Sequence, residues 1–212
     1  LAGWAAAAKK YGLPFGISFH ADHAWTWYEP AQRYDREGDK MGVSYDGTLT
    51  KADGKGKWWE GYDPQDLYAQ NHPLSKGSWA DGMIHRQWAW GNGAATPSQK
   101  FCTNFYNRTL DAINRYNPDL IYFDVTAVPF YPVSDAGLKI AAHFYNHNMA
   151  THKGKLEAVM FGKILDENQR KGLVWDVERG APNQIQETAW QSCSCIGGWH
   201  YNTSIYENNG YK

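Results

Sequence analysis

The chain has 212 residues, enough for one sizeable domain or two small ones. Its formal net charge of -1 excludes the strongly basic surface with which proteins bind nucleic acid or anionic membranes. No run approaches the ~20 consecutive apolar residues of a membrane-spanning helix, so neither nucleic acid nor a membrane is expected as a partner.

Helical and strand segments alternate along the chain. Helices are predicted at residues 1–10, 97–116 and 134–148, where apolar residues recur at helical spacing in the two longer segments. Short, continuous apolar runs, typical of strands covered on both faces, lie between and after them. These runs are residues 13–19, 120–123, 158–161, 173–177 and 194–199. The alternation predicts an α/β fold with a parallel sheet.

The pattern lapses between about residues 29 and 97, which are rich in Gly, Asp, Lys and Trp and include KADGKGKWWEGYDPQDLYAQ. An insertion of this length between a strand and a helix is usually functional. The sequence contains no internal repeat and no convincing linker. We therefore predict a single domain over residues 1–212 that carries a Trp-rich insertion.

Three of the predicted strands end in a titratable residue. The segment NPDLIYFDVTAVPF places Asp124 after a buried strand, GISFHADHAW places His20 after another, and LVWDVERG places Glu178 after a third. In a (β/α)8 barrel the catalytic groups lie at the carboxyl ends of the strands. This pattern favours such a barrel, with Asp124 and Glu178 as catalytic carboxylates. Asp119 is a turn residue in this interpretation, and Asp176 is a rival that shares the face of Glu178.

The 11 Trp and 14 Tyr residues are unusually many. Aromatic side chains in polar loops suit sugars, which alternate C–H faces with hydroxyls, although most large aromatics fill cores. Two carboxylates among aromatics suit glycoside hydrolysis, in which one attacks the anomeric carbon and the other transfers the proton. No metal or other cofactor is expected for this chemistry, and the His, Asp and Glu spacing does not indicate a tight metal site.

Four motifs resemble the α-L-fucosidases of glycoside hydrolase family 29. PDLIYFD at 118–124 resembles the nucleophile region of that family, and AKKYGLPFGISFHADHAW resembles its preceding helix and strand. VWDVERG resembles the segment of the acid/base residue, and AWQSCSCIGGWHYN resembles a later strand. The motifs follow the family order over residues 1–202. The resemblance implies a TIM-like barrel and a retaining exo-glycosidase that hydrolyses α-L-fucosides of oligosaccharides or glycoconjugates.

The resemblance also implies roles for individual residues. Asp124 corresponds to the nucleophile and Glu178 to the general acid/base. Trp199 corresponds to an aromatic residue against the apolar side of fucose, and Tyr122 to an aromatic residue beside the nucleophile. Lys163 stands where the family usually has Arg, and Lys offers a point donor in place of a fork.

Other positions depart from the family pattern. His20, His23 and Trp25 stand near the usual tyrosines of the first strand and are candidates to replace their sugar contacts. Gln191 replaces a Glu, and none of the eight histidines is adjacent to another. A full barrel takes ~250 residues, so we expect only its central strands here, with the remainder of the barrel elsewhere in a longer polypeptide.

Two alternatives remain open at this point. One is a related retaining glycosidase that acts on galactosides or sulfated fucans, and the other is a sugar-binding fragment without catalysis. The three cysteines do not decide the redox compartment, and a secreted, periplasmic or lysosomal location is compatible with the resemblance.

Overall fold

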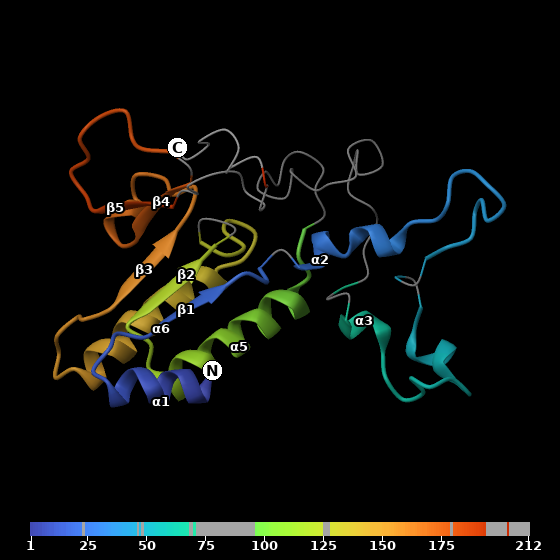
Figure 1. The fold of residues 1–212 in the computed structure, drawn as a ribbon, viewed down its shortest axis with the longest axis horizontal. Helices are drawn as coiled ribbons and strands as arrows, with labels where there is room; N and C mark the ends of the chain where they lie inside the picture. Colours follow the sequence, from blue (N-terminus) through green and yellow to red (C-terminus); the bar gives the residue numbers. More distant parts are fainter. Residues whose placement is uncertain are drawn as a thin grey trace.

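A computed structural model describes residues 1–22, 24–45, 47, 49–67, 70, 96–124, 128–178, 180–193 and 203. In this part of the chain, helices alternate with the strands of one sheet (Figure 1). The sheet has five strands in the order β1-β2-β3-β4-β5, and every neighbouring pair is parallel. The predicted α/β fold with a parallel sheet is therefore confirmed.

The strands are short, and four of them overlap the predicted apolar runs. Their bounds are Gly16–Phe19 for β1, Leu120–Phe123 for β2, Val159–Gly162 for β3, Val174–Glu178 for β4 and Trp190–Cys193 for β5. The strand expected over residues 194–199 lies outside the described residues. The edge strand in the structure is β5, directly before that range.

Three helices of nine or more residues occupy the predicted positions: α1 (Ala2–Lys10), α5 (Gln99–Tyr116) and α6 (Ala136–Thr151). Helix α5 begins where the Ser98 side chain accepts a hydrogen bond from the Phe101 backbone N–H at 3.1 Å, as an N-cap residue does. It ends at Asn117, whose φ of 43° is left-handed and stops the helix.

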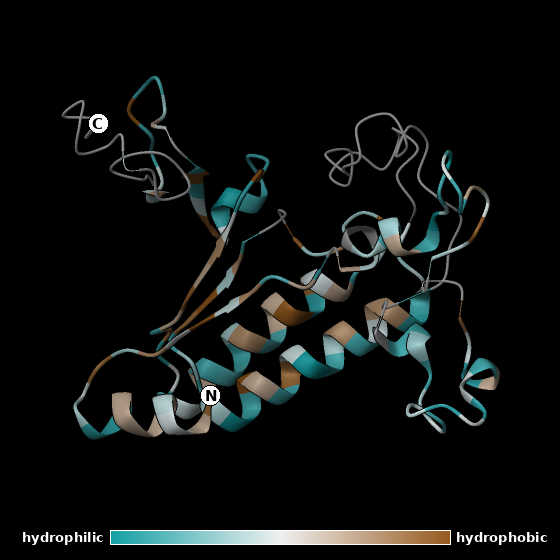
Figure 2. Ribbon diagram, turned by 45° about the vertical axis from the view of Figure 1, so that its right-hand side comes forward, coloured by the Kyte–Doolittle hydropathy of each residue, from teal (hydrophilic) through white to brown (hydrophobic). Residues whose placement is uncertain are grey.

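The core lies between the sheet and the two long helices. Figures 1 and 2 show α5 and α6 on the same face of the sheet, with apolar residues recurring along both helices. This face contributes Phe105 and Ile113 from α5, Ile140 and Phe144 from α6, and Ile121, Phe123 and Met160 from the strands, all buried. Because side chains alternate along a strand, Tyr122 and Asp124 point to the opposite face.

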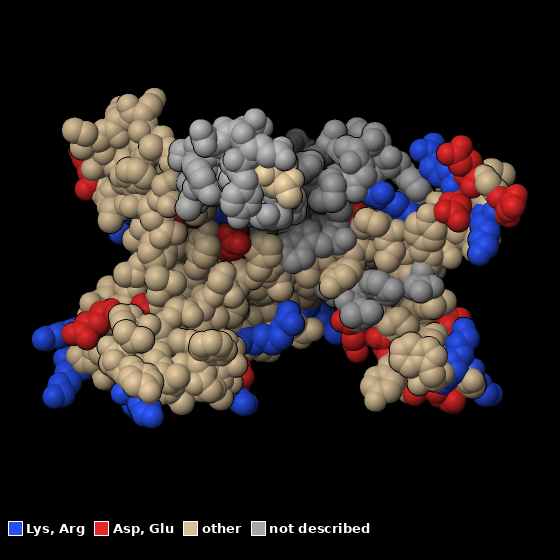
Figure 3. Space-filling view, in the orientation of Figure 1, with Lys and Arg blue, Asp and Glu red and all other residues tan. Residues whose placement is uncertain are grey.

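Helix α2 (Ala24–Trp27) directly precedes the insertion. The described part of the insertion contains only short elements, which are α3 (Pro64–Leu67) and 3-10 helices at Glu29–Gln32 and Lys51–Gly54. Another 3-10 helix, Gln169–Lys171, precedes β4. On the face shown in Figure 3, cationic and acidic side chains lie close together at the right-hand end and at the lower left. No helix in the described ranges has the length and apolarity to cross a bilayer.

Candidate active site

Four polar residues meet at the carboxyl edge of the sheet. His20 follows β1, Asp124 follows β2, Lys163 follows β3, and Glu178 is the last residue of β4. The last residues of β1, β2 and β3, which are Phe19, Phe123 and Gly162, lie side by side in the sheet. The residue after each of them is therefore brought to the same place. We call His20, Asp124, Lys163 and Glu178 the strand-end cluster.

Lys163 joins the two carboxylates of the cluster. Its Nζ lies 2.7 Å from Asp124 Oδ1 and 3.3 Å from Glu178 Oε2. The side chain of Lys163 is 13% exposed, whereas the carboxylates are 34% and 43% exposed. A largely buried cation thus lies between two acids that remain open to solvent on their other sides.

His20 provides a second basic group next to Asp124. Its Nε2 lies 3.3 Å from Asp124 Oδ2, the oxygen that Lys163 does not contact. The imidazole is mostly exposed, with 60% of its side-chain surface accessible. Each oxygen of Asp124 therefore has its own nitrogen partner, which orients the carboxylate.

A second layer lies beneath the cluster on the same face of the sheet. Tyr122, two residues before Asp124, donates its hydroxyl hydrogen to Oδ2 of Asp176, two residues before Glu178. Asp176 is 2% exposed and also accepts from the Cys193 thiol at 3.6 Å. The Lys163 ammonium lies over the Tyr122 ring at 5.9 Å from its centroid, which links the two layers.

The electrostatics of the cluster favour an ionised Asp124. Burial by itself would raise the pKa of Asp124, but the hydrogen bond from Lys163, with the positive charges of Lys163 and His20, holds it below the usual value. Burial would likewise lower the pKa of Lys163, yet its contacts with Asp124 and Glu178 raise it. Burial raises the pKa of Tyr122, and its hydrogen bond to Asp176 raises it further.

The structure brings together five of the eight residues predicted for the site. They are His20, Tyr122, Asp124, Lys163 and Glu178, which form or adjoin the strand-end cluster. His23 and Trp199 lie outside the described residues.

The structure places Trp25, which was expected to contact the substrate, in the core and not in the strand-end cluster. Its side chain is 0% exposed, and its indole packs against Phe101 and Phe130 with ring centroids 5.0 and 6.1 Å apart. The physical reason is that the Trp25 side chain extends from the short helix α2 toward α5, where the indole fills the core.

Asp176 is the residue whose role the sequence did not reveal. The sequence indicates Asp176 only as a rival to Glu178 for the role of catalytic carboxylate, because the two share one face of β4. Its partner, Tyr122, lies on β2, 54 positions away in the sequence. One sequence feature could have indicated this pairing. Tyr122 and Asp176 each lie two residues before a carboxylate, Asp124 and Glu178, and residues two apart on a strand share a face.

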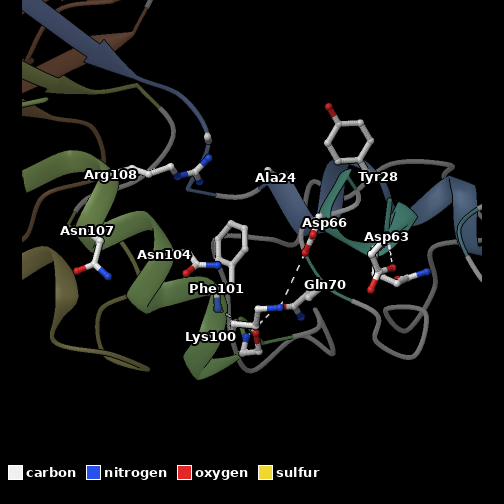
Figure 4. A pocket seen from close by; sticks show the side chains of 13 residues that line it. Ala24, Tyr28, Asp63, Asp66, Gln70, Lys100, Phe101, Asn104, Asn107 and Arg108 are labelled. Atoms are coloured by element: carbon white, nitrogen blue, oxygen red, sulfur yellow. Dashed lines mark hydrogen bonds and ion pairs between the residues drawn. The ribbon is translucent and has the colours of Figure 1, made fainter. Parts of the chain in front are cut away.

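A separate polar pocket of about 860 Å³ lies between α5 and the insertion (Figure 4). Asn104 and Arg108 line it from α5, one turn apart, and Tyr28 lines it from the insertion. Lys100 pairs with Asp66 across it at 3.9 Å. Its lining includes Ala21, which directly follows His20, but no member of the strand-end cluster.

The candidate site shows no metal centre in the ranges that the structure describes, where no three His, Cys, Asp or Glu side chains are grouped closely enough to hold an ion. Two of the cysteines, Cys102 and Cys193, are free thiols.

A parallel α/β sheet with two carboxylates at its carboxyl edge is the arrangement of barrel glycoside hydrolases. The family profile described as Alpha-L-fucosidase matches residues 1–212. The chain belongs to this family of glycoside hydrolases, and its five parallel strands are consistent with part of the TIM barrel of family 29. A search of curated proteins found no match.

Proposed function

We propose that this chain carries the catalytic pair of a retaining exo-α-L-fucosidase, with Asp124 as nucleophile and Glu178 as general acid/base. Its substrates are α-L-fucosides at the ends of oligosaccharides or glycoconjugates. Family membership supports the substrate class. The observation that carries the catalytic assignment is the contact of one ammonium group, Lys163 Nζ, with both carboxylates.

The spacing of the carboxylates favours the retaining mechanism. Since Lys163 Nζ is 2.7 Å from one oxygen and 3.3 Å from the other, these oxygens are at most about 6 Å apart. Retaining glycosidases separate their carboxyl groups by ~5–5.5 Å, and inverting enzymes by ~6.5–9.5 Å to admit a water. The bound applies to the two oxygens that contact Lys163, and it is nearer to the retaining separation.

The proposed reaction has two displacements. An Asp124 oxygen forms a bond to the anomeric carbon as the glycosidic C–O bond breaks, and Glu178 gives its proton to the departing oxygen. Glu178 then takes a proton from water, whose oxygen attacks the anomeric carbon and releases Asp124. The low pKa of Asp124 keeps the nucleophile ionised at neutral pH.

The neighbouring residues orient the pair and the sugar in this proposal. Lys163 and His20 each contact one oxygen of Asp124 and offer donors to sugar hydroxyls. Tyr122 lines the inner side of the site through its position beneath Lys163. His23 and Trp199 are proposed as sugar contacts on the family resemblance, with Trp199 against the C6 methyl group.

The nucleophile is tested by Asp124→Gly in the complete natural polypeptide with an activated aryl fucoside. We expect kcat/KM to fall at least about 10³-fold, equivalent to ~4 kcal/mol in the barrier. Activity within about tenfold of the parent, with the fold intact by circular dichroism, would refute the assignment. Glu157→Ala is the matched control, because Glu157 is an exposed carboxylate just before the amino end of β3.

The acid/base residue is tested by Glu178→Ala with azide. Azide needs no general base, so it should restore turnover of a substrate with a good leaving group and yield a fucosyl azide of retained anomeric configuration. In Asp124→Gly, azide should instead replace the nucleophile and give the inverted product. Product analysis by NMR distinguishes the two, and the absence of rescue in folded Glu178→Ala would contradict its role.

A larger substrate is favoured by one observation, the polar pocket between α5 and the insertion. Its lining carries Lys100 and Arg108 beside Asp63 and Asp66, and Lys100 pairs with Asp66, so its charge favours neither a sulfated nor an unsulfated substrate. Comparing kcat/KM for sulfated and unsulfated fucosyl oligosaccharides, and for galactosides, decides among these substrates. Binding of fucose by calorimetry without turnover would point to the non-catalytic alternative.

A further inference from the structure

Asp176 is a buried carboxylate for which the proposed double displacement has no direct use. It is 2% exposed, and in the described part of the chain no Lys, Arg or His nitrogen lies within ion-pair distance of it. Its Oδ1 has no hydrogen-bond partner, whereas Oδ2 accepts from Tyr122 and from the Cys193 thiol. Burying a carboxylate in this way is costly, which suggests that the Tyr122 contact is retained for function.

Tyr122 stands between two carboxylates on the same face of the sheet. Its hydroxyl donates to Asp176 and is also within hydrogen-bonding reach of Asp124. A phenol has one hydrogen to donate. The two carboxylates therefore compete for it, and in the structure it is directed to Asp176.

We propose that Asp176 is a positioning residue that retains the Tyr122 hydroxyl hydrogen and thereby keeps Asp124 basic enough to attack the sugar. The inference rests on the proposed function of Asp124. With the hydrogen directed to Asp176, Asp124 has Lys163 and His20 as its donors. Without Asp176, the hydroxyl turns to Asp124, stabilises its charge before the reaction and weakens it as a nucleophile.

The sign of the pH effect follows from the groups around Asp124. His20 faces it from β1, Lys163 from β3, and Tyr122 lies on its own strand. The acids Asp176 and Glu178 approach from β4, and the Cys193 thiol on β5 contacts Asp176. Removing the charge of Asp176 removes a repulsion and adds a hydrogen bond, and both changes lower the pKa of Asp124.

The main experiment is Asp176→Asn in the complete natural polypeptide, since Asn keeps the shape, removes the charge and leaves an amide oxygen that accepts more weakly than the Asp124 carboxylate. With an aryl fucoside we expect kcat to fall about tenfold and the acidic limb of kcat/KM to move to lower pH. Tyr122→Phe should move the limb to higher pH, because the charge of Asp176 then acts on Asp124 without the intervening hydroxyl.

A double-mutant cycle tests whether Asp176 acts through Tyr122. In the Tyr122→Phe background, Asp176→Asn should change kcat less than about threefold, since the hydrogen that it controls is absent. The control is Asp119→Asn, at the amino end of β2, where Asp119 Oδ2 accepts from the Phe15 backbone N–H at 2.8 Å. This change should reduce thermal stability without moving the acidic limb.

Three outcomes would overturn the inference. They are an unmoved or upward-shifted limb in folded Asp176→Asn, additive effects in the cycle, and a downward shift in Tyr122→Phe. The last outcome applies even when Asp176→Asn does not fold. A fully active Asp124→Gly would instead refute the proposed function, so the two failures are distinguishable.

Discussion

Lys163 is the residue through which the two proposed catalytic carboxylates are held together. Two acids within about 6 Å of each other repel, and a cation between them offsets this repulsion. The ammonium lies in contact with both and is itself largely buried. The point charge of Lys163 can contact one oxygen of each acid at the same time.

Replacing Lys163 by Met should therefore lower kcat/KM about 10²-fold, or ~2.7 kcal/mol, because the positive charge no longer holds Asp124 ionised. The same loss should raise the pKa of Asp124, so the acidic limb of kcat/KM should move to higher pH. Lys139→Met is the control, since Lys139 forms an exposed ion pair with Asp135 at 3.0 Å. An unchanged pH profile in Lys163→Met would contradict this role.

The lowered pKa of Asp124 also links stability to pH. A carboxylate whose pKa is depressed by folding contributes stability above its unfolded pKa, about 3.9, and loses that contribution as pH falls through the folded pKa. In Asp124→Asn this contribution is absent. The melting temperature of the variant should fall less steeply than that of the parent across the acidic range, as measured by calorimetry at several pH values.

At the scale of the element, Gly137 shows how tightly α6 is seated. A Cβ at this position would lie 2.5 Å from the Pro129 carbonyl oxygen and 2.5 Å from Val128 Cγ1. The first turn of α6 therefore packs against the segment that follows β2, the strand that carries Asp124. The absence of a side chain at Gly137 permits this approach.

Gly137→Ala should destabilise the protein by about 1–3 kcal/mol, because overpacking outweighs the better helix propensity of Ala. The matched control is Gly3→Ala in α1, where an added Cβ meets nothing within 4 Å. That substitution should stabilise by about 0.5–1 kcal/mol. Denaturant titration of both variants measures the difference, and a shift of the same sign in both would contradict the packing argument.

At the scale of the whole molecule, an aromatic cluster joins the segment before the insertion to the helices. Trp25 from α2 packs on Phe101 of α5 and on Phe130, and Phe105 of α5 packs on Phe130 at 5.1 Å. All four side chains are buried. The cluster connects α2, directly after the His20 strand, with the segment after Asp124, so the geometry of the site depends on the core beside it.

Trp25→Ala should therefore destabilise by about 3–5 kcal/mol, and Trp25→Phe by less. In the folded Phe variant KM for an aryl fucoside should stay within about twofold, because the indole contributes packing and not a sugar contact. Trp58→Ala is the control, as Trp58 is 94% exposed. A raised KM without any loss of stability would restore Trp25 as a substrate contact.

The sequence by itself determined the elements and the edge of the sheet where the strand-end cluster lies. Apolar periodicity located α5 and α6, and the strands that precede Asp124 and Glu178 were visible because each is a short buried run ending in a carboxylate. These signals depend on neighbouring residues, which is why sequence patterns contain them.

Only the tertiary structure decided which groups touch. Lys163 contacts a carboxylate on each side because β3 lies between β2 and β4, and strand order is not visible in a local pattern. The pairing of Tyr122 with Asp176 spans 54 positions, and the burial of Trp25 depends on how α2 meets α5. Long-range contacts follow from the packing of the whole chain, whereas local patterns report only on their own segment.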